Sequence, residues 1–222
     1  MTAPTERKRW FDRHPRLTIS VFNLCSCALL VILAEFMTRV SCPGWAPPRA
    51  ERVKLWIYDE QLGWAHRPNQ RARFNNPDFS VDVRINALGM RAGEYPVART
   101  GKERMLVLGD SFGWGLGVEQ PQRFSELLEQ RHPGWEIVNA SVIGYGTDQE
   151  LLYLKEKGLA LKPDVVLLLF CDNDFENNTH AEQYLYFKPY FTVAGGALQL
   201  HNVPVPKSNI KQRLTRFLIG RT

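Results

Sequence analysis

A run of 18 residues without a charge, from Leu17 to Ala34, is the feature that most restricts how this chain can fold. Its length approaches the roughly 20 apolar residues that a helix needs to cross a bilayer. A cluster of basic residues precedes it, namely Arg7, Lys8, Arg9, Arg13 and Arg16. Basic residues in front of a span favour a cytoplasmic N-terminus, so the rest of the chain is expected outside the cytoplasm, in the periplasm or the extracellular space.

Two other interpretations of this run stay open. A cleaved signal peptide also has an apolar core, but this run is long for such a core and continues into EFMTRV, which is not a small-residue cleavage site. A buried core helix would not require the basic flank. We therefore expect an uncleaved membrane anchor at residues 17–40.

The remaining composition is that of an ordinary globular protein. Of the 222 residues, 44% are hydrophobic and 23% are charged, and the formal net charge is only +5. No basic face with interleaved aromatic residues is present, so we expect no nucleic-acid partner. The four cysteines have neither the pairing nor the histidine spacing that is typical of zinc sites. We expect no metal and no cofactor.

The pattern of the chain changes twice after the apolar run. Short β-like stretches with turn residues between them predict a small β-rich extension. Further along, three apolar strands (RMLVLGD, EIVNAS and PDVVLLLF) alternate with two amphipathic helices (RFSELLEQRH and TDQELLYLKEKGL). Strands that are apolar on both faces and separated by helices predict an α/β domain with a parallel sheet, covered by helices on each side. The expected parts are a basic cytoplasmic N-terminus at 1–16, the anchor at 17–40, a linker at 41–50, the extension at 51–103 and the α/β domain at 104–222.

Three polar loops follow the three predicted strands. The first lies in MLVLGDSFGWGLGV and carries Asp110 and Ser111, the second is SVIGYGT and the third is CDNDFENN. The reactive positions of an open parallel sheet lie beyond the carboxyl ends of its strands, so the three loops are expected to meet at one edge. The glycines after Ser111 have neither the dinucleotide-binding nor the P-loop spacing, which argues against a phosphate site.

In this order, the GDS, NASVIGYG and DND segments resemble the first three signature blocks of the SGNH (GDSL-type) hydrolases. The stretches INALGMR, GYGTDQELLYL and KPYF extend the resemblance to membrane-anchored members of that superfamily. The resemblance implies a three-layer, flavodoxin-like domain with a parallel sheet. It also implies a serine esterase, a deacetylase or an O-acyltransferase that acts on an ester, for example on an acylated carbohydrate of the cell surface.

The resemblance assigns roles to three residues. Ser111 would be the nucleophile. The backbone N–H of Gly144, the side-chain amide of Asn173 and the N–H of Ser111 would form the oxyanion hole, which stabilises the charge that develops when the serine attacks. Simpler interpretations remain: a glycine at the start of a helix for Gly144, and an Asx-turn for Asn173. Cys171 stands where the family usually has glycine.

The catalytic base is the missing element. The family takes its histidine and the carboxylate that orients it from one late Asp-x-x-His block, and this sequence contains no such block. His180, seven residues after Asn173, is the candidate substitute base, but no carboxylate stands at the usual spacing from it. His66 and the other histidines are expected to be structural or solvated.

The predicted sheet also ends on an apolar strand with an open edge. We therefore expect this sequence to be the N-terminal part of a longer enzyme or a product of truncation. The alternative function is that of a catalytically silent domain that at most binds an acyl or carbohydrate ligand.

Overall fold

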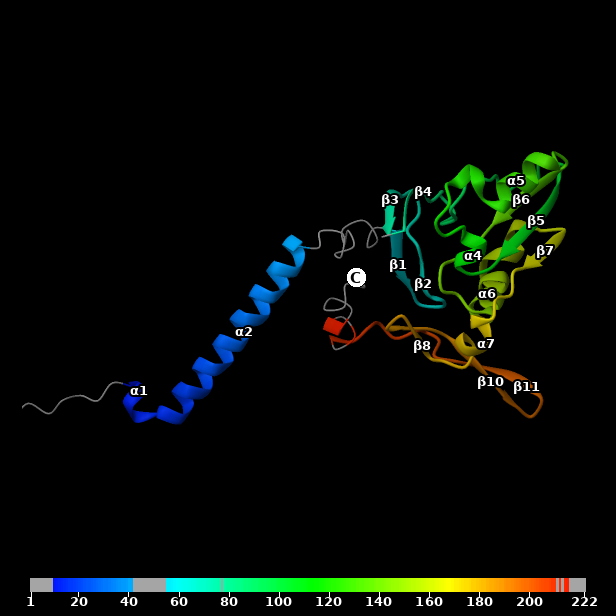
Figure 1. Cartoon of the computed structure of the whole chain (residues 1–222). Helices are drawn as coiled ribbons and strands as arrows, with labels where there is room; N and C mark the ends of the chain where they lie inside the picture. The colour runs from blue at the N-terminus through cyan, green and yellow to red at the C-terminus, as the bar shows by residue number, and fades with distance from the viewer. Residues whose placement is uncertain (1–9, 42–54, 77, 211, 213, 216–222) are drawn as a thin grey trace, which may run out of the picture. The chain divides into compact units, whose positions relative to one another are not determined.

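The computed structural model describes residues 10–41, 55–76, 78–210, 212, 214 and 215 (Figure 1). The chain divides into two compact units, Met1–Ala46 and Pro47–Thr222. The predicted β-rich extension and the predicted α/β domain therefore belong to one unit, and the predicted anchor belongs to the other.

The described residues of the N-terminal unit, 10–41, form the helices α1 (Trp10–Arg13) and α2 (Pro15–Ser41). Within α2, the span Pro15–Thr38 is long and apolar enough to cross a membrane. Large apolar side chains cover α2 and are solvent-exposed, with Phe22 at 70% and Leu24 at 72%. The prediction of one long apolar helix near the N-terminus is confirmed.

A small parallel sheet forms the centre of the second unit. Its strands are β5 (Glu103–Leu108), β6 (Trp135–Asn139) and β7 (Val165–Leu168), in the order β6-β5-β7. Both neighbours run parallel to β5. The predicted parallel sheet of three strands is therefore confirmed.

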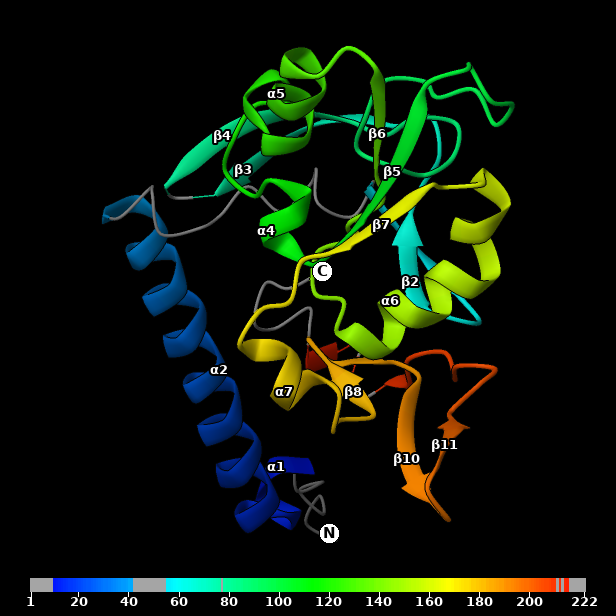
Figure 2. The same cartoon turned by 90° about the vertical axis from the view of Figure 1, so that its right-hand side faces the viewer.

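Helices connect these strands. A short helix, α4 (Ser111–Trp114), and a 3₁₀ turn, η1 (Gln120–Gln122), lead from β5 to α5 (Phe124–Arg131). After β6, helix α6 (Thr147–Tyr153) continues through a π turn and a 3₁₀ turn as far as Leu161. In Figure 2, α5 and α6 lie on opposite sides of the sheet.

Side chains of β5 and β6 are buried in the core, whereas those of β7, on the other side of β5, are partly exposed to solvent. Leu106 and Val138 are fully buried. On β7, Val165 and Val166 remain 40% exposed, because β5 is the only strand that pairs with β7 in the described part of the chain. The predicted apolar edge is thus present.

Two antiparallel hairpins form the extension: β1 (Trp56–Asp59) with β2 (Gly63–His66), and β3 (Arg71–Asn76) with β4 (Phe79–Arg84). Strand β2 was not predicted, because GWAH has no alternation of apolar and polar residues. Phe74 and Val81 of the second hairpin pack around Trp114 of α4, whose side chain is fully buried. The extension therefore supports the helix that begins with Ser111.

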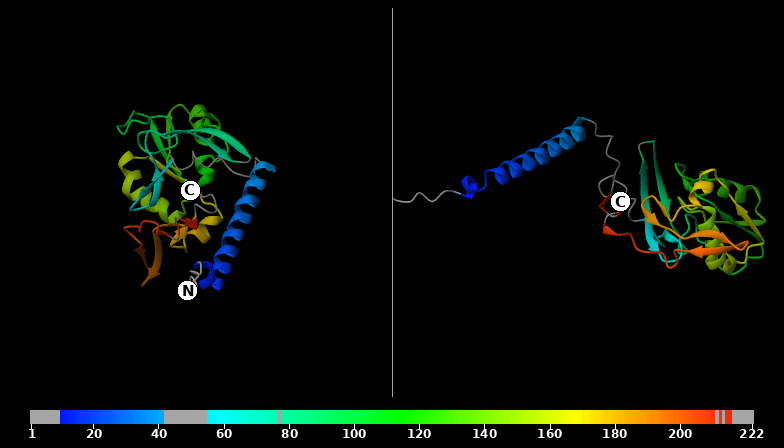
Figure 3. Two further views of the ribbon diagram at one scale, coloured as in Figure 1. Left: turned by 90° about the vertical axis from the view of Figure 1, so that its left-hand side faces the viewer. Right: turned by 90° about the horizontal axis from the view of Figure 1, so that it is seen from below.

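The segment after the third polar loop contains structure that the sequence analysis did not predict. Helix α7 (Asn173–Asn177) is followed by two small hairpins, β8 (Glu182–Gln183) with β9 (Tyr186–Phe187) and β10 (Tyr190–Ala194) with β11 (Ala197–His201). The β10–β11 hairpin, orange in Figure 3, extends away from the sheet. The Gly195–Gly196 pair at its turn, with both φ angles positive, was the available signal.

His66 has a structural role, as expected for this residue. Its Nε2 accepts a hydrogen bond from Nε1 of Trp114 at 2.9 Å, so its Nδ1 carries the proton and donates to the carbonyl of Gly89 at 3.1 Å. Burial, together with the positive charges of Arg91 and Arg123, lowers the pKa of His66 to about 4. The ring is therefore neutral at physiological pH.

We predict that this histidine makes the fold sensitive to acid. The unfolded chain binds a proton at about pH 6.5 and the folded chain only near pH 4, so stability is lost as the pH falls through this window, by up to about 3 kcal/mol. Urea unfolding at pH 7 and pH 4.5 should show a smaller loss for His66→Asn than for the unchanged protein. An NMR titration that finds His66 protonated near pH 6.5 would contradict the prediction.

Candidate active site

Ser111 lies in a tight turn between β5 and α4. Asp110 is the N-cap of α4, and its Oδ1 accepts a hydrogen bond from the N–H of Phe112 at 2.9 Å, so Asp110 shapes the turn. A side chain at position 113 could not be accommodated, because a Cβ on Gly113 would lie 2.3 Å from Oγ of Ser141. Ser111 itself is half-buried, and its hydroxyl makes no hydrogen bond with a described residue.

The first position of a helix leaves its N–H without an intrahelical acceptor, and Ser111 occupies this position in α4. The serine thus presents both a hydroxyl and a backbone donor at the carboxyl end of the central strand. A nucleophile that also contributes to an oxyanion hole requires this combination.

The third polar loop approaches the Ser111 turn. Asn173 begins α7, and its Nδ2 lies 3.4 Å from Oδ2 of Asp110, the residue before Ser111. Asn173 is exposed, so its amide remains accessible. The structure therefore brings together the predicted nucleophile loop and the predicted oxyanion asparagine.

The second polar loop is attached to the same turn. Val142 stands two residues before Gly144, and its N–H donates a hydrogen bond to the carbonyl of Gly109 at 2.9 Å. Gly144 has a φ of +80°, and a Cβ at this position would lie 2.5 Å from the Tyr184 ring. Both facts require glycine here. The N-cap of α6 is Gly146, so Gly144 precedes the helix and is not its first residue.

A buried lysine joins the second and third loops. Lys188 has no exposed side-chain surface, and its ammonium group pairs with the carboxylate of Asp148 in the first turn of α6. The same ammonium donates to the carbonyls of Asn177, at 3.0 Å, and His180, at 3.4 Å. The backbone N–H of Asp148 also donates a hydrogen bond to Oδ1 of Asn178, at 3.1 Å, which links the same two loops. We call this group the Lys188 clamp.

The sequence analysis did not assign a role to Lys188. The signal was present in the KPYF stretch, which was noted only as part of the resemblance. Burial raises the pKa of Asp148, and the positive charge of Lys188 opposes this shift. Burial lowers the pKa of Lys188, and the negative charge of Asp148 opposes that shift. In both groups the effect of burial outweighs the attraction of the partner.

A second carboxyl group of α6 is buried without a counter-charge. Glu150 is 1% exposed, and neither of its carboxyl oxygens has a hydrogen-bond partner in the described part of the chain. Burial, together with the charges of Asp174, Asp110 and Asp148, raises its pKa to about 8. Glu150 is therefore mostly protonated at neutral pH.

Among the described residues, no group of histidines, cysteines or carboxylates has the arrangement of a metal site.

Arg91 fixes the other end of α4. Its buried guanidinium donates to the carbonyls of Gly115 and Val118, both at 2.6 Å, and stacks 4.3 Å from the centre of the Trp114 ring. This arginine ends the INALGMR stretch, and sequence reasoning gave it no role. Its contacts set the position of α4, and thus of Ser111, against the extension.

His180, the candidate substitute base, is not brought to the nucleophile. Its side chain is exposed, and the described residues show no interaction of its ring with Ser111 or with a carboxylate. Its hydrogen bonds are made by its backbone: the N–H donates to the carbonyl of Asn177, and the carbonyl accepts from the ammonium of Lys188. In this structure, His180 is part of the loop that the Lys188 clamp holds.

A scan against protein-family models finds no match to the chain, and a comparison with curated proteins finds none either. The functional interpretation therefore rests on the residues and their geometry.

We predict that the Lys188 clamp is a major source of stability. Lys188→Met leaves the Asp148 carboxylate buried without its partner and should lower the free energy of unfolding by about 3–5 kcal/mol. The matched control is Lys157→Met, which removes an exposed ion pair with Asp59 (2.9 Å) and should cost about 1 kcal/mol or less. Urea unfolding measures both. Equal losses for the two variants would contradict a structural role of the buried pair.

Proposed function

We propose that residues 104–222 form the nucleophile and oxyanion side of a three-layer, flavodoxin-like SGNH hydrolase domain. On this proposal the protein is a serine esterase, a deacetylase or an O-acyltransferase. The observation that carries it is the contact of Asn173 with Asp110, which puts the candidate oxyanion amide beside the turn that carries Ser111. The bond between Val142 and Gly109 supports the same arrangement for the loop of Gly144.

The chemistry would be acyl transfer. Oγ of Ser111 would attack the ester carbonyl and transfer its proton to a base, while the N–H groups of Ser111 and Gly144 and the amide of Asn173 stabilise the oxyanion. The alcohol would leave with the proton from the base, and water or an acceptor alcohol would then release the acyl group. The base is the component that the described residues do not supply, because His180 lies without contact to Ser111.

We further propose that α2 anchors the protein in a membrane and that Ser111 acts outside the cytoplasm. The exposed apolar span Pro15–Thr38 and the basic residues before it support this orientation. An acylated carbohydrate of the cell surface would then be within reach of the anchored domain.

The second candidate function is that of a catalytically silent domain that binds an acyl or carbohydrate ligand. The observation in its favour is the Ser111 hydroxyl, which has no hydrogen-bonded base among the described residues. An alcohol without a base stays neutral at pH 7 and is a weak nucleophile.

Chemical rescue separates the two functions. We expect the chain of 222 residues to hydrolyse a short-chain nitrophenyl ester barely above background, because loss of the base costs a serine hydrolase roughly 10⁶ in turnover. Added imidazole should act as the missing base and raise the rate at least about 10-fold over Ser111→Ala measured in the same imidazole. Asn173→Ala should lower the rescued rate by ~10²–10³.

Two results would change this conclusion. If imidazole raises the rate of the unchanged chain and of Ser111→Ala equally, the silent domain is the correct function. If the chain is active without imidazole and both Ser111→Ala and His180→Ala abolish that activity, His180 is the base after all.

The membrane orientation has a separate test. Alkaline phosphatase fused after Pro48 folds into an active enzyme only outside the cytoplasm, so we expect activity from this fusion. We expect no activity after removal of residues 17–34. A reporter at the same position that is active only in the cytoplasm would refute the proposed orientation.

A further inference from the structure

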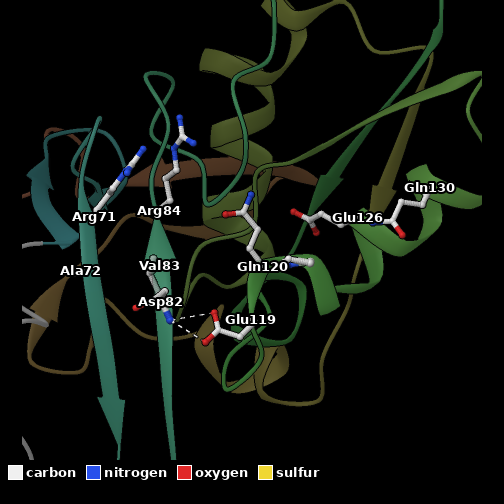
Figure 4. A pocket seen from close by; sticks show the side chains of 10 residues that line it. Arg71, Ala72, Asp82, Val83, Arg84, Glu119, Gln120, Glu126 and Gln130 are labelled. Carbon is white, nitrogen blue, oxygen red and sulfur yellow. Dashed lines mark hydrogen bonds between the residues drawn. The ribbon is translucent and has the colours of Figure 1, made fainter.

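A cavity of about 700 Å³ lies between the β3–β4 hairpin and the segment formed by η1 and α5 (Figure 4). Its lining includes neither Ser111 nor either of the other two predicted oxyanion residues. The volume is in the range of small-ligand sites. The cavity is therefore a second candidate site in the same unit.

Two arginines on one wall are arranged in an unfavourable way for a surface without a ligand. Arg71 and Arg84 are direct cross-strand neighbours, and like charges in this position destabilise a hairpin. On the same hairpin, Arg73 is satisfied by Asp82 at 3.0 Å. Arg71 makes no ion pair with a described residue, and the pair of Arg84 with Glu94 is long, at 3.9 Å, between half-exposed side chains.

The carboxylates around the cavity do not neutralise these arginines. Asp82 is bound by Arg73, and Glu126 is held by the buried guanidinium of Arg123. Glu119 accepts hydrogen bonds from the backbone N–H of Asp82 at 3.2–3.3 Å. The lining thus keeps one guanidinium group, that of Arg71, without an ion pair, a second, that of Arg84, with only the long pair to Glu94, and one carboxylate, that of Glu119, without a cationic partner among the described residues.

The opposite wall offers neutral hydrogen-bonding groups. The side-chain amides of Gln120 and Gln130 have no hydrogen-bond partner in the described part of the chain. In Figure 4, Gln120 and Glu126 lie on the η1–α5 side of the cavity, opposite the hairpin that carries Arg71 and Arg84. Pro121 is exposed and supplies apolar surface beside these groups, whereas Val83 is 2% exposed and belongs to the core. No aromatic ring lines the cavity, so a base or another flat ring would find no stacking surface.

We propose that this cavity binds an acidic oligosaccharide, whose carboxylate is held by Arg71 and Arg84. Guanidinium forks match the geometry of a carboxylate and bind it in a bidentate way. The amides of Gln120 and Gln130 bind sugar hydroxyls, and Pro121 contacts a C–H face of the ring. The inference goes beyond the proposed function, because the cavity contains no group of the Ser111 site.

Isothermal titration calorimetry on the full chain in detergent micelles tests this proposal with three probes: trigalacturonic acid, the neutral trisaccharide maltotriose and inorganic phosphate. We expect trigalacturonate to bind at least about 10-fold more tightly than either of the other two. Arg71→Gln/Arg84→Gln should weaken its binding by at least about 10-fold, and Gln120→Ala/Gln130→Ala should weaken it without changing the charge.

The matched control is Arg67→Gln/Arg99→Gln, which removes the same charge from exposed positions outside the cavity and should change the Kd less than about 2-fold. Equal weakening by both arginine pairs, equal binding of maltotriose, or equally tight binding of phosphate would overturn the proposal. Ser111→Ala should leave the Kd unchanged, so a failure of the esterase proposal is distinguishable from a failure of this one.

Discussion

The pairing of β5 with a parallel strand on each edge is the constraint on which the rest of the second unit depends. Parallel strands end at the same edge of a sheet, so the segments after β5, β6 and β7 are forced into one region. Hydrogen bonds extend the pairing beyond the strands themselves, from Val142 to Gly109 and from Leu169 to Leu108, both at 2.9 Å. The loops therefore leave the sheet in fixed positions, and the Ser111 turn lies between them.

Buried arginine and lysine side chains then fix the positions of loop segments that the strand pairing does not determine. Arg104 pairs with Glu136 at 2.6 Å and donates to carbonyls of the segment 96–98 and of Leu161. Arg91 and Lys188 likewise bind carbonyls of segments that are distant in sequence. A buried charge is costly unless it is fully hydrogen-bonded, so each cation enforces one arrangement of the segments that it contacts. Irregular loops thereby acquire a defined geometry without secondary structure of their own.

Arg91 also connects the two candidate sites. Its guanidinium binds the carbonyl of Trp114 at the end of α4 and the carbonyl of Asp82 on the cavity hairpin, at 3.2 and 3.4 Å. The nucleophile helix and the wall of the cavity thus share one buried group. A chain that binds a polymer in the cavity and acts on an ester at Ser111 would benefit from such a fixed separation between the two sites, since positioning is a large part of catalysis.

The sequence by itself determined the apolar N-terminal helix, the three parallel strands and the loops in which Ser111, Gly144 and Asn173 lie. These features depend on local patterns: an uncharged run, apolar strands that alternate with helices, and polar residues at strand ends. Only the tertiary structure decided that Lys188 and Arg91 position the loops, that Glu150 is buried without a counter-charge, and that Arg71 and Arg84 share a cavity with α5. A lysine or an arginine in a sequence carries no signal of burial, because burial depends on contacts between segments far apart in the chain. The β8–β9 hairpin escaped prediction because its two-residue strands have no periodicity to read, whereas the β10–β11 hairpin, with strands of five residues, offered its Gly195–Gly196 turn as the signal.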